Sequence, residues 1–414
     1  TMTEEIWNDW IEIWSKYTFE GFLTAHTTKS ELDFIEENKF VFVGLRPWPH
    51  IAIRGLKAVS YAPAYQSVSL VELLRDGLGK WWKDPMHTLR DGMDTLPRSF
   101  VNPNLWGPQS KVPDNKLLLT SNIYYYNQVW KIDYRRQGSD KKIIVHSRHS
   151  VTSAQYQEKC DYVIVTVPLP IIQNLEFEPP LSSFKQEAIR STRYESSTKV
   201  LLKFSEQFWR VDIEKGEPFN RPMLASEEII SGGHDVTTDT ASQIVYPTPT
   251  NHQFKEDGNK PYIDWDYSDT VHLDDNSKAG ILVSYSWGYE ATRLAAFKEN
   301  DACTIVLRTI CEMHARRRYP DDVEKYKKYY NQIFNLFISG KVQSWDQDPN
   351  VGGAFVLFEP YQYVDYWQDL INWPQSLLQF DDCLTFKDLM YNIKKLQEMY
   401  KTNDKIFNAI NSMK

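Results

Sequence analysis

The sequence predicts a protein of the α+β or α/β class with more than one domain. Its 414 residues are enough for two or more domains with sizeable hydrophobic cores. Two patterns occupy different parts of the chain: large apolar residues at helical spacing near the N-terminus, and short runs of β-branched and aromatic residues further on. The first pattern predicts amphipathic helices and the second predicts strands, so a mixed fold follows.

Residues 1–88 are predicted to form a small helical bundle. Between Glu4 and Thr24, large apolar side chains recur every three or four positions, which is the spacing of one helix face. They are Trp7, Trp10, Ile11, Trp14 and Tyr17. Further helical signal follows at His50–Val59 and at Ser69–Gly77. We therefore expect an all-helical first domain.

Residues 89–192 change to strands and turns. Strands are expected at Leu117–Leu119, Val129–Ile132, Lys142–Val145 and Tyr162–Val167. The Tyr162–Val167 run carries no charge, which suits a strand buried on both faces, and Pro168 ends it. Ser182 or Ser183 can then cap a helix at about Phe184–Ser191.

Residues 193–365 are predicted to form a further domain around a mixed sheet. Its strands are expected at Val200–Phe204, Ile281–Ser286 and Gly353–Phe358. Residues 210–278 are polar and rich in Gly, Pro, Asn and Asp, which predicts a long insertion or loop. Residues 366–414 predict a divergent amphipathic helical tail.

A helical stretch at Ala291–Tyr319 ends in three arginines, Arg316 to Arg318. Cations suit a helix C-terminus, and Pro320 follows as a stop. A phosphate site at these arginines is the less favoured alternative. On the same stretch, we predict that His314 is partly exposed rather than a catalytic base.

Four segments of the chain resemble the flavin-dependent amine oxidases, and among these the L-amino-acid oxidases most. They are DGMDTLPRSF at 91–100, NQVWKI at 127–132, the strand–turn–helix–strand stretch at 160–209, and WDQDPNVGGAFVLFEPYQ at 345–362. Each is weak alone, but their order over about 270 residues is specific. The resemblance implies an incomplete FAD-linked amine oxidase fold, with 1–88 as helical domain, 89–192 as partial FAD-binding domain and 193–365 as substrate-binding domain.

The resemblance also implies a reaction and its residues. An L-amino acid would be oxidised to an imine and then a 2-oxo acid, with hydride passing to FAD and molecular oxygen reduced to hydrogen peroxide. Lys199 matches the lysine that holds a water beside the flavin, and Trp345 matches the tryptophan packed near the flavin. Further matches are Tyr285, Gly353 and Ala354 on the substrate side, and Val129, Gly92 and Met93 on the cofactor side.

The residues themselves leave structural alternatives open. Lys199 can equally be a lysine at a strand end that extends its ammonium to water. Trp345 can be a core residue, and Tyr285 can lie at a rim. Substrate class is open as well, because a monoamine or polyamine would suit the same motifs.

One expected motif is missing from the sequence. None of the 17 glycines belongs to a Gly-x-Gly-x-x-Gly run, which would bring a helix N-terminus to the FAD pyrophosphate. The nearest candidate, Gly77-Leu78-Gly79, has the pattern of a helix end. We therefore expect a fragment that does not retain FAD by itself. The alternatives are a degenerate, non-catalytic binding protein, or one piece of a split enzyme whose complementary chain supplies the dinucleotide-binding half.

Composition argues against several other functions. The net charge is −8 and no basic run stands out, so we expect no nucleic-acid partner. No apolar segment approaches the roughly 18 residues of a membrane span, so no membrane partner is expected. The four cysteines have no metal-ligand spacing, which predicts no metal site.

Overall fold

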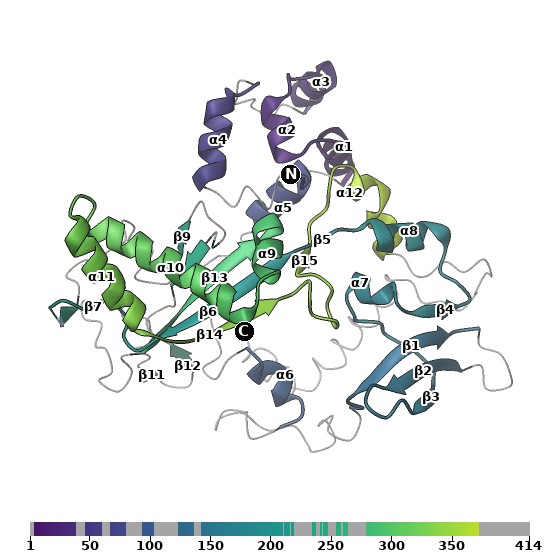
Figure 1. Cartoon of the computed structure of the whole chain (residues 1–414). Helices are drawn as coiled ribbons and strands as arrows, with labels where there is room; N and C mark the ends of the chain where they lie inside the picture. The colour runs from purple at the N-terminus through teal and green to yellow at the C-terminus, as the bar shows by residue number, and fades with distance from the viewer. Residues whose placement is uncertain are drawn as a thin grey trace. The chain divides into compact units, whose positions relative to one another are not determined.

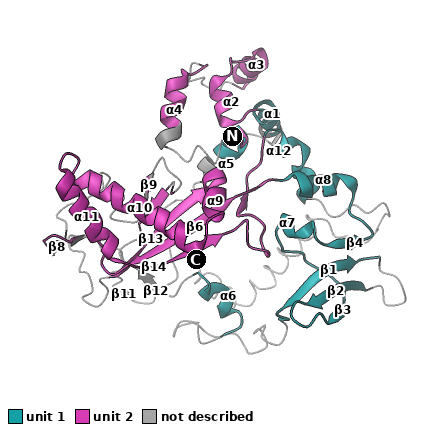
Figure 2. Ribbon diagram, viewed as in Figure 1, with its two compact units in different colours: residues 1–16, 70–192, 360–414 teal, residues 17–69, 193–359 magenta. Residues whose placement is uncertain are grey.

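The structure is a computed structural model. It describes residues 4–38, 46–59, 67–79, 93–102, 123–135, 142–209 and 279–371, with short pieces between 211 and 263. The chain divides into two compact units that alternate along the sequence (Figure 2). Unit 1 comprises 1–16, 70–192 and 360–414, and unit 2 comprises 17–69 and 193–359.

Unit 1 combines short helices with one four-stranded sheet (Figure 1). Its helices are α1 (Glu4–Trp14), α5 (Leu70–Gly79), α6 (Thr95–Ser99), α7 (Leu169–Ile172), α8 (Ser183–Ser191), α12 (Gln362–Asp365) and α13 (Trp367–Ile371). Its strands are β1 (Asn127–Asp133), β2 (Ile143–His149), β3 (Gln155–Cys160) and β4 (Glu176–Glu178). The order is β3-β2-β1-β4; β1, β2 and β3 pair antiparallel, and β4 runs parallel to β1.

The helix expected near Phe184–Ser191 is confirmed as α8, and its cap is Ser182. The Ser182 hydroxyl accepts a hydrogen bond from the Lys185 N–H at 3.2 Å. This satisfies one of the N–H groups that the first turn of a helix leaves unpaired. The other candidate, Ser183, is the first helical residue and is exposed.

The prediction of a strand at Tyr162–Val167 is wrong. The segment belongs to no strand, and it is mostly exposed, with Tyr162 at 73% and Ile164 at 80%. A β-branched run becomes a buried strand only when neighbouring strands supply its backbone hydrogen bonds and cover its faces. Among the residues that the structure describes, no strand pairs with this run.

Unit 2 is built on a five-stranded antiparallel sheet in the order β14-β6-β13-β10-β9. These strands are β6 (Ser197–Phe204), β9 (His234–Val236), β10 (Gln243–Val245), β13 (Gly280–Trp287) and β14 (Phe337–Ser344). Short pairs are β5 (Tyr194–Glu195) with β15 (Phe355–Val356), β7 (Val211–Asp212) with β8 (Glu217–Pro218), and β11 (Phe254–Asp257) with β12 (Lys260–Ile263). The helices are α2 (Phe19–Thr24), α3 (Lys29–Glu37), α4 (His50–Val59), α9 (Gly288–Ala295), α10 (Glu299–Arg318) and α11 (Val323–Asn335).

One face of this sheet forms the main hydrophobic core with α9, α10 and α11. Alternate residues of β6, Val200, Leu202 and Phe204, are fully buried. They belong to one cluster with Leu282 of β13 and with apolar residues of the helices such as Ile310. Because strand side chains alternate between faces, the odd-numbered residues of β6 lie on the opposite face.

Several predicted helical stretches are helical in the structure, but the helices begin and end at other residues. The stretches at Glu4–Thr24 and Ala291–Tyr319 are each two helices, α1 with α2 and α9 with α10. Thr18 explains one break, since its hydroxyl caps α2 by accepting from the Gly21 N–H at 2.9 Å. As predicted, α10 ends at Arg318, before Pro320.

The prediction that His314 is partly exposed is wrong, because its side chain is fully buried. The Tyr246 hydroxyl lies 2.9 Å from Nε2 of His314 and donates a hydrogen bond to Asp235 at 3.0 Å. Burial, helped by the nearby Arg317 charge, lowers the pKa of His314 to about 3. Arg317 and Arg318 pair with acidic side chains, which favours the structural interpretation of this arginine cluster over a phosphate site.

The predicted loop at 210–278 is described only in part. Within it, β9 and β10 extend the main sheet of unit 2. The strand predicted at Leu117–Leu119 and residues 372–414 of the predicted tail lie outside the described residues.

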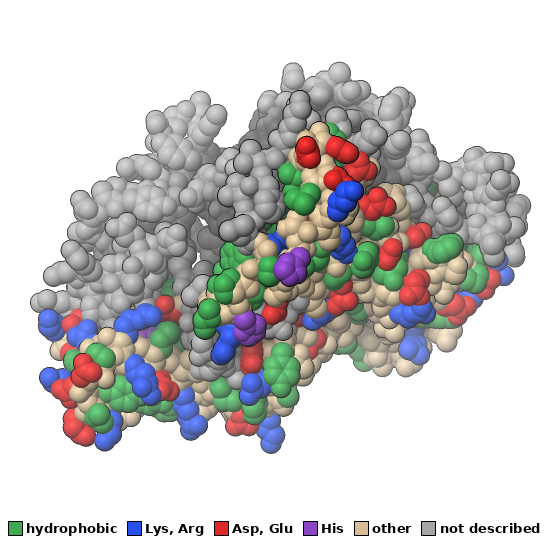
Figure 3. Space-filling view, turned by 90° about the horizontal axis from the view of Figure 1, so that it is seen from above, with side chains coloured by type: hydrophobic (Ala, Val, Ile, Leu, Met, Phe, Trp, Pro, Cys, Tyr) green, Lys and Arg blue, Asp and Glu red, His purple; other side chains and the backbone are tan. Residues whose placement is uncertain are grey.

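On the face that Figure 3 shows, acidic and basic side chains of the described residues intermingle. Within the described part of the chain, no helix is both long and apolar enough to span a bilayer.

Candidate functional site

Lys199 lies within β6, on the sheet face opposite the helices. The sequence placed it just before the strand, but β6 begins two residues earlier, at Ser197. Its direct neighbours across the sheet are Tyr285 of β13 and Gln343 of β14. All three side chains are half-buried, and Lys199 forms no ion pair within the described part of the chain. An amine, a phenol and an amide therefore stand in one row across three strands.

The Lys199 ammonium lies over the aromatic ring of Tyr285. The Lys199 Nζ atom lies 4.7 Å from the centroid of the Tyr285 ring. A cation above an aromatic ring is attracted by about 0.5–1 kcal/mol when partly exposed. The ring of Tyr285 meets Trp287 edge-on at 5.3 Å, and Trp287 meets Phe355 at 5.0 Å. A line of aromatic rings thus borders the amine.

Trp345 is the first residue of a loop, 345–354, that is closed by backbone hydrogen bonds and lies beside β5 and β6. Its N–H donates to the Ser197 carbonyl at 3.0 Å, and its own carbonyl accepts from the Gly353 N–H at 3.1 Å. The next residue, Ala354, donates its N–H to the Glu195 carbonyl at 2.9 Å. The structure therefore ties the loop with Trp345, Gly353 and Ala354 to the stretch formed by β5 and β6, and β6 carries Lys199.

Gly353 is fixed by its backbone and by its neighbour. Its φ is +149°, a conformation that favours glycine. A Cβ at this position would lie 2.5 Å from Cβ of Tyr194, too close for any side chain. The loop can close only with glycine here.

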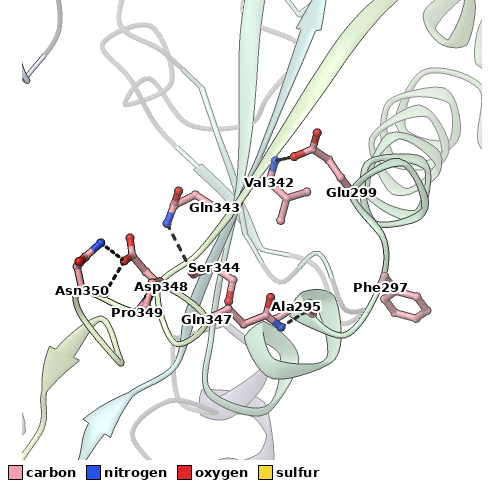
Figure 4. A pocket seen from close by; sticks show the side chains of 10 residues that line it. All are labelled: Ala295, Phe297, Glu299, Val342, Gln343, Ser344, Gln347, Asp348, Pro349 and Asn350. Atoms are coloured by element: carbon pink, nitrogen blue, oxygen red, sulfur yellow. Dashed lines mark hydrogen bonds between the residues drawn. The ribbon is translucent and has the colours of Figure 1, made fainter. Parts of the chain in front are cut away.

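A pocket of about 510 Å³ lies along the outer side of β14 (Figure 4). Asp348, Pro349 and Asn350 stand on one side of it, and Phe297 and Glu299 on the other. Gln343, the neighbour of Lys199, is also in its wall. Among the described residues that line it, Asp348 and Glu299 are acidic, and Glu299 pairs with Lys341 at 2.8 Å.

The residues predicted to contact the cofactor from the FAD domain fall in unit 1. Val129 lies in β1, half-buried, where the pairing with β2 shifts by one residue. Met93 is exposed, and Gly92 lies outside the described residues. No three His, Cys, Asp or Glu side chains gather as metal ligands anywhere in the described ranges.

Three residues of this sheet face were not among the predicted site residues: Gln343, Trp287 and Ser197. The first two lie on the Lys199 face, as direct neighbours of β6 residues. The signal for Trp287 was present, since it stands two residues after Tyr285 and a strand repeats its faces every second residue. Gln343 and Ser197 required the register between strands, which one sequence does not contain.

Comparison with known proteins agrees with the motifs. A family model described as flavin containing amine oxidoreductase matches residues 4–380. An L-amino-acid oxidase of Siganus canaliculatus is 28% identical over 67% of this chain and 40% of its own length. The putative L-amino-acid oxidase YobN of Bacillus subtilis is 26% identical over 73% and 49%. The chain thus spans less than half the length of these relatives.

Among solved structures, the cyclohexylamine oxidase of Brevibacterium oxydans is similar over 60% of this chain and 40% of that one. The TM-score is 0.37 and the identity is 13%. The mixed helices and sheets of the described residues agree with the α+β class expected from the sequence. On the family match, which covers nearly the whole chain, the protein belongs to the flavin containing amine oxidoreductases.

Proposed function

We propose that the protein is part of an L-amino-acid oxidase, which converts an L-amino acid to a 2-oxo acid and hydrogen peroxide. One observation supports the proposal: Lys199 and Tyr285 are cross-strand neighbours, and the Trp345 backbone bonds to the same strand at Ser197, in a chain of this family. L-amino-acid oxidases among the relatives favour an amino acid over a simple amine as substrate.

The family implies a flavin, and the residues at this site fit the ring part of one. Lys199 stands beside the aromatic row of Tyr285, Trp287 and Phe355, which suits a planar, partly polar ring system. The pyrophosphate part has no matching glycine motif in this sequence. When bound, FAD would supply the hydride acceptor.

The chain's own residues would then bind and orient the substrate and the flavin ring. The Tyr285 hydroxyl would donate a hydrogen bond to the substrate carboxylate, and the backbone at Gly353 and Ala354 would border the substrate. The Lys199 ammonium would hold a water for imine hydrolysis or flavin reoxidation. Trp345 would pack near the flavin ring, while Val129, Gly92 and Met93 would serve the cofactor from the FAD domain.

The test is peroxide release from the form of the protein that carries FAD, with matched panels of L-amino acids, D-amino acids and amines. Peroxide with L-amino acids is the expected result. Peroxide release with amines alone would mean that the substrate is an amine instead of an amino acid. No peroxide release with any compound would contradict the proposal.

A second candidate is a non-catalytic binding protein, favoured by the missing Gly-x-Gly-x-x-Gly motif. A visible spectrum of the purified chain tests whether it binds flavin, separately from whether it is an enzyme. We expect no flavin bands, because the pyrophosphate finds no matching motif in this chain. A stoichiometric flavin spectrum would contradict that expectation and would make the chain testable as an enzyme without further parts.

A further inference from the structure

Glu195, Ser197 and Lys199 are every second residue of one extended stretch that runs from β5 into β6. The single residue between these strands, Ser196, does not interrupt the extended backbone. The carbonyls of Glu195 and Ser197 both accept hydrogen bonds from the loop at residues 345–354, at 2.9 and 3.0 Å. The carbonyl of Ser196 points to the opposite edge, where it accepts from the Gly288 N–H at 2.9 Å. Carbonyls alternate in this way only in an extended strand, so the three side chains share one face.

The middle member, Ser197, has a buried hydroxyl that finds no hydrogen-bond partner among the described residues. The side chain is fully buried, and its Oγ atom forms no hydrogen bond with any described residue. Its neighbour Thr198 differs, since the Thr198 hydroxyl points to the helical side and donates to the Ala291 carbonyl at 2.9 Å. Buried polar groups are nearly always satisfied by protein or by ordered water. We therefore expect water beside Ser197.

The spacing suits water bridges on both sides of Ser197. Residues two apart in a strand are about 6.6 Å apart. Neither Glu195 nor Lys199 hydrogen-bonds the Ser197 hydroxyl directly, and one water can bridge groups at this separation. A hydroxyl both donates and accepts, so Ser197 can pass a proton from one neighbour to the other.

The far end of the row is a buried carboxyl group. Glu195 is only 1% exposed, and burial raises the pKa of its carboxyl. The Arg193 guanidinium lies 3.1 Å from Glu195 and 3.1 Å from Glu359, whose side chain is 37% exposed. Glu195 therefore lies one ion pair away from the partly exposed Glu359, and the row runs from Glu195 to Lys199, which faces Tyr285 and Gln343.

We propose that Glu195, Ser197 and Lys199, linked by buried water, form a proton-transfer row that restores the proton of the Lys199 amine. The inference rests on the proposed function, in which Lys199 faces the reaction. After the Lys199 ammonium gives a proton to the reacting molecules, Ser197 donates one through water to the amine and accepts one from the Glu195 carboxyl. Glu195 regains a proton from solvent, so one proton enters for each that leaves.

A crystal structure of the protein tests the row without any flavin. We expect water within about 3 Å of Ser197 Oγ, on the sides of both Lys199 and Glu195. A Ser197 hydroxyl that bonds only to protein groups, with no water beside it, would overturn the proposal. Because this readout needs no turnover, it decides the row even when peroxide assays fail and the proposed function falls.

Kinetics of the FAD-carrying form give the second readout. Ser197→Ala should lower kcat about tenfold and raise the solvent deuterium isotope effect, since a positioned proton donor is lost. Ser197→Thr, which keeps a hydroxyl, should restore much of the rate. Ser196→Ala is the matched control and should leave kcat unchanged. In wild type, kcat should fall with rising pH as Glu195 ionises. Glu195→Gln should remove this fall. Equal kcat and isotope effect in Ser197→Ala and wild type would overturn the row.

Discussion

Among single residues, Gly353 is the one whose replacement the structure excludes most clearly. Its positive φ and its contact with Tyr194 leave no room for a Cβ. We expect Gly353→Ala to lower the free energy of unfolding by about 1–3 kcal/mol, because strained backbone of this kind costs that much. Urea denaturation measures it.

Gly55 provides the control for this substitution. It lies inside α4, and a Cβ there would meet nothing within 4 Å. Gly55→Ala should therefore stabilise the protein by up to about 1 kcal/mol. If both substitutions changed the free energy of unfolding equally, a Cβ at position 353 would not clash with Tyr194.

The buried His314 predicts a pH dependence of stability. Its folded pKa of about 3 lies below the ordinary value of 6.5, so between these values only the unfolded chain binds the proton. The free energy of unfolding should therefore fall as the pH drops from about 6.5 toward 3, by up to about 1.4 kcal/mol per pH unit.

Denaturation of wild type and His314→Gln at several pH values isolates this contribution from other titrating groups. The stability difference between the two proteins should change with pH across that window. A difference that stays constant from pH 7 to pH 4 would mean that His314 is not buried in its neutral form.

His314 also shows what a single sequence hides at this scale. It continues the apolar stripe of α10 that includes Leu307, Ile310 and Cys311, so burial was visible in the spacing. The hydrogen-bond partner was not visible, because Tyr246, the residue that follows β10, lies 68 residues away in the sequence. Lys199 and Tyr285 were named through family motifs, and only strand register made them neighbours.

At the scale of elements, the cap of α8 can be tested directly because two serines compete for the role. Ser182→Ala should lower the free energy of unfolding by about 1 kcal/mol, since the Lys185 N–H loses its acceptor. Ser183→Ala is the matched control and should change little, because Ser183 is exposed in the first turn. The opposite order of effects in urea denaturation would place the cap at Ser183.

Elements that depend on local signals were predictable, and those that depend on distant partners were not. The helix α8 and the strands β1, β6 and β13 lie close to their predicted ranges, because a capping residue and short runs of apolar, β-branched and aromatic residues mark them. The run at Tyr162–Val167 carries equally strong strand propensity, yet it has no partner strand among the described residues. Propensity alone does not make a sheet.

At the scale of the whole molecule, the family residues divide between the two units. Lys199, Tyr285 and Trp345 belong to unit 2, whereas Val129 and Met93 belong to unit 1. The sequence motifs predicted the family and the candidate residues. The domain limits at 88, 192 and 365 remain predictions, because the two units alternate along the chain and sequence patterns do not report which distant segments pack together.

We propose that amine oxidation takes place at the sheet face that carries Lys199. The most direct measurement compares peroxide release by Lys199→Met and Lys203→Met in the FAD-carrying form, with the L-amino acid that wild type oxidises fastest. Lys203 lies on the same strand and face but is exposed. We predict that Lys199→Met lowers kcat about a hundredfold, the scale of a lost acid–base group, and that Lys203→Met keeps the wild-type rate. Wild-type kcat in Lys199→Met, with flavin bound, would contradict the account.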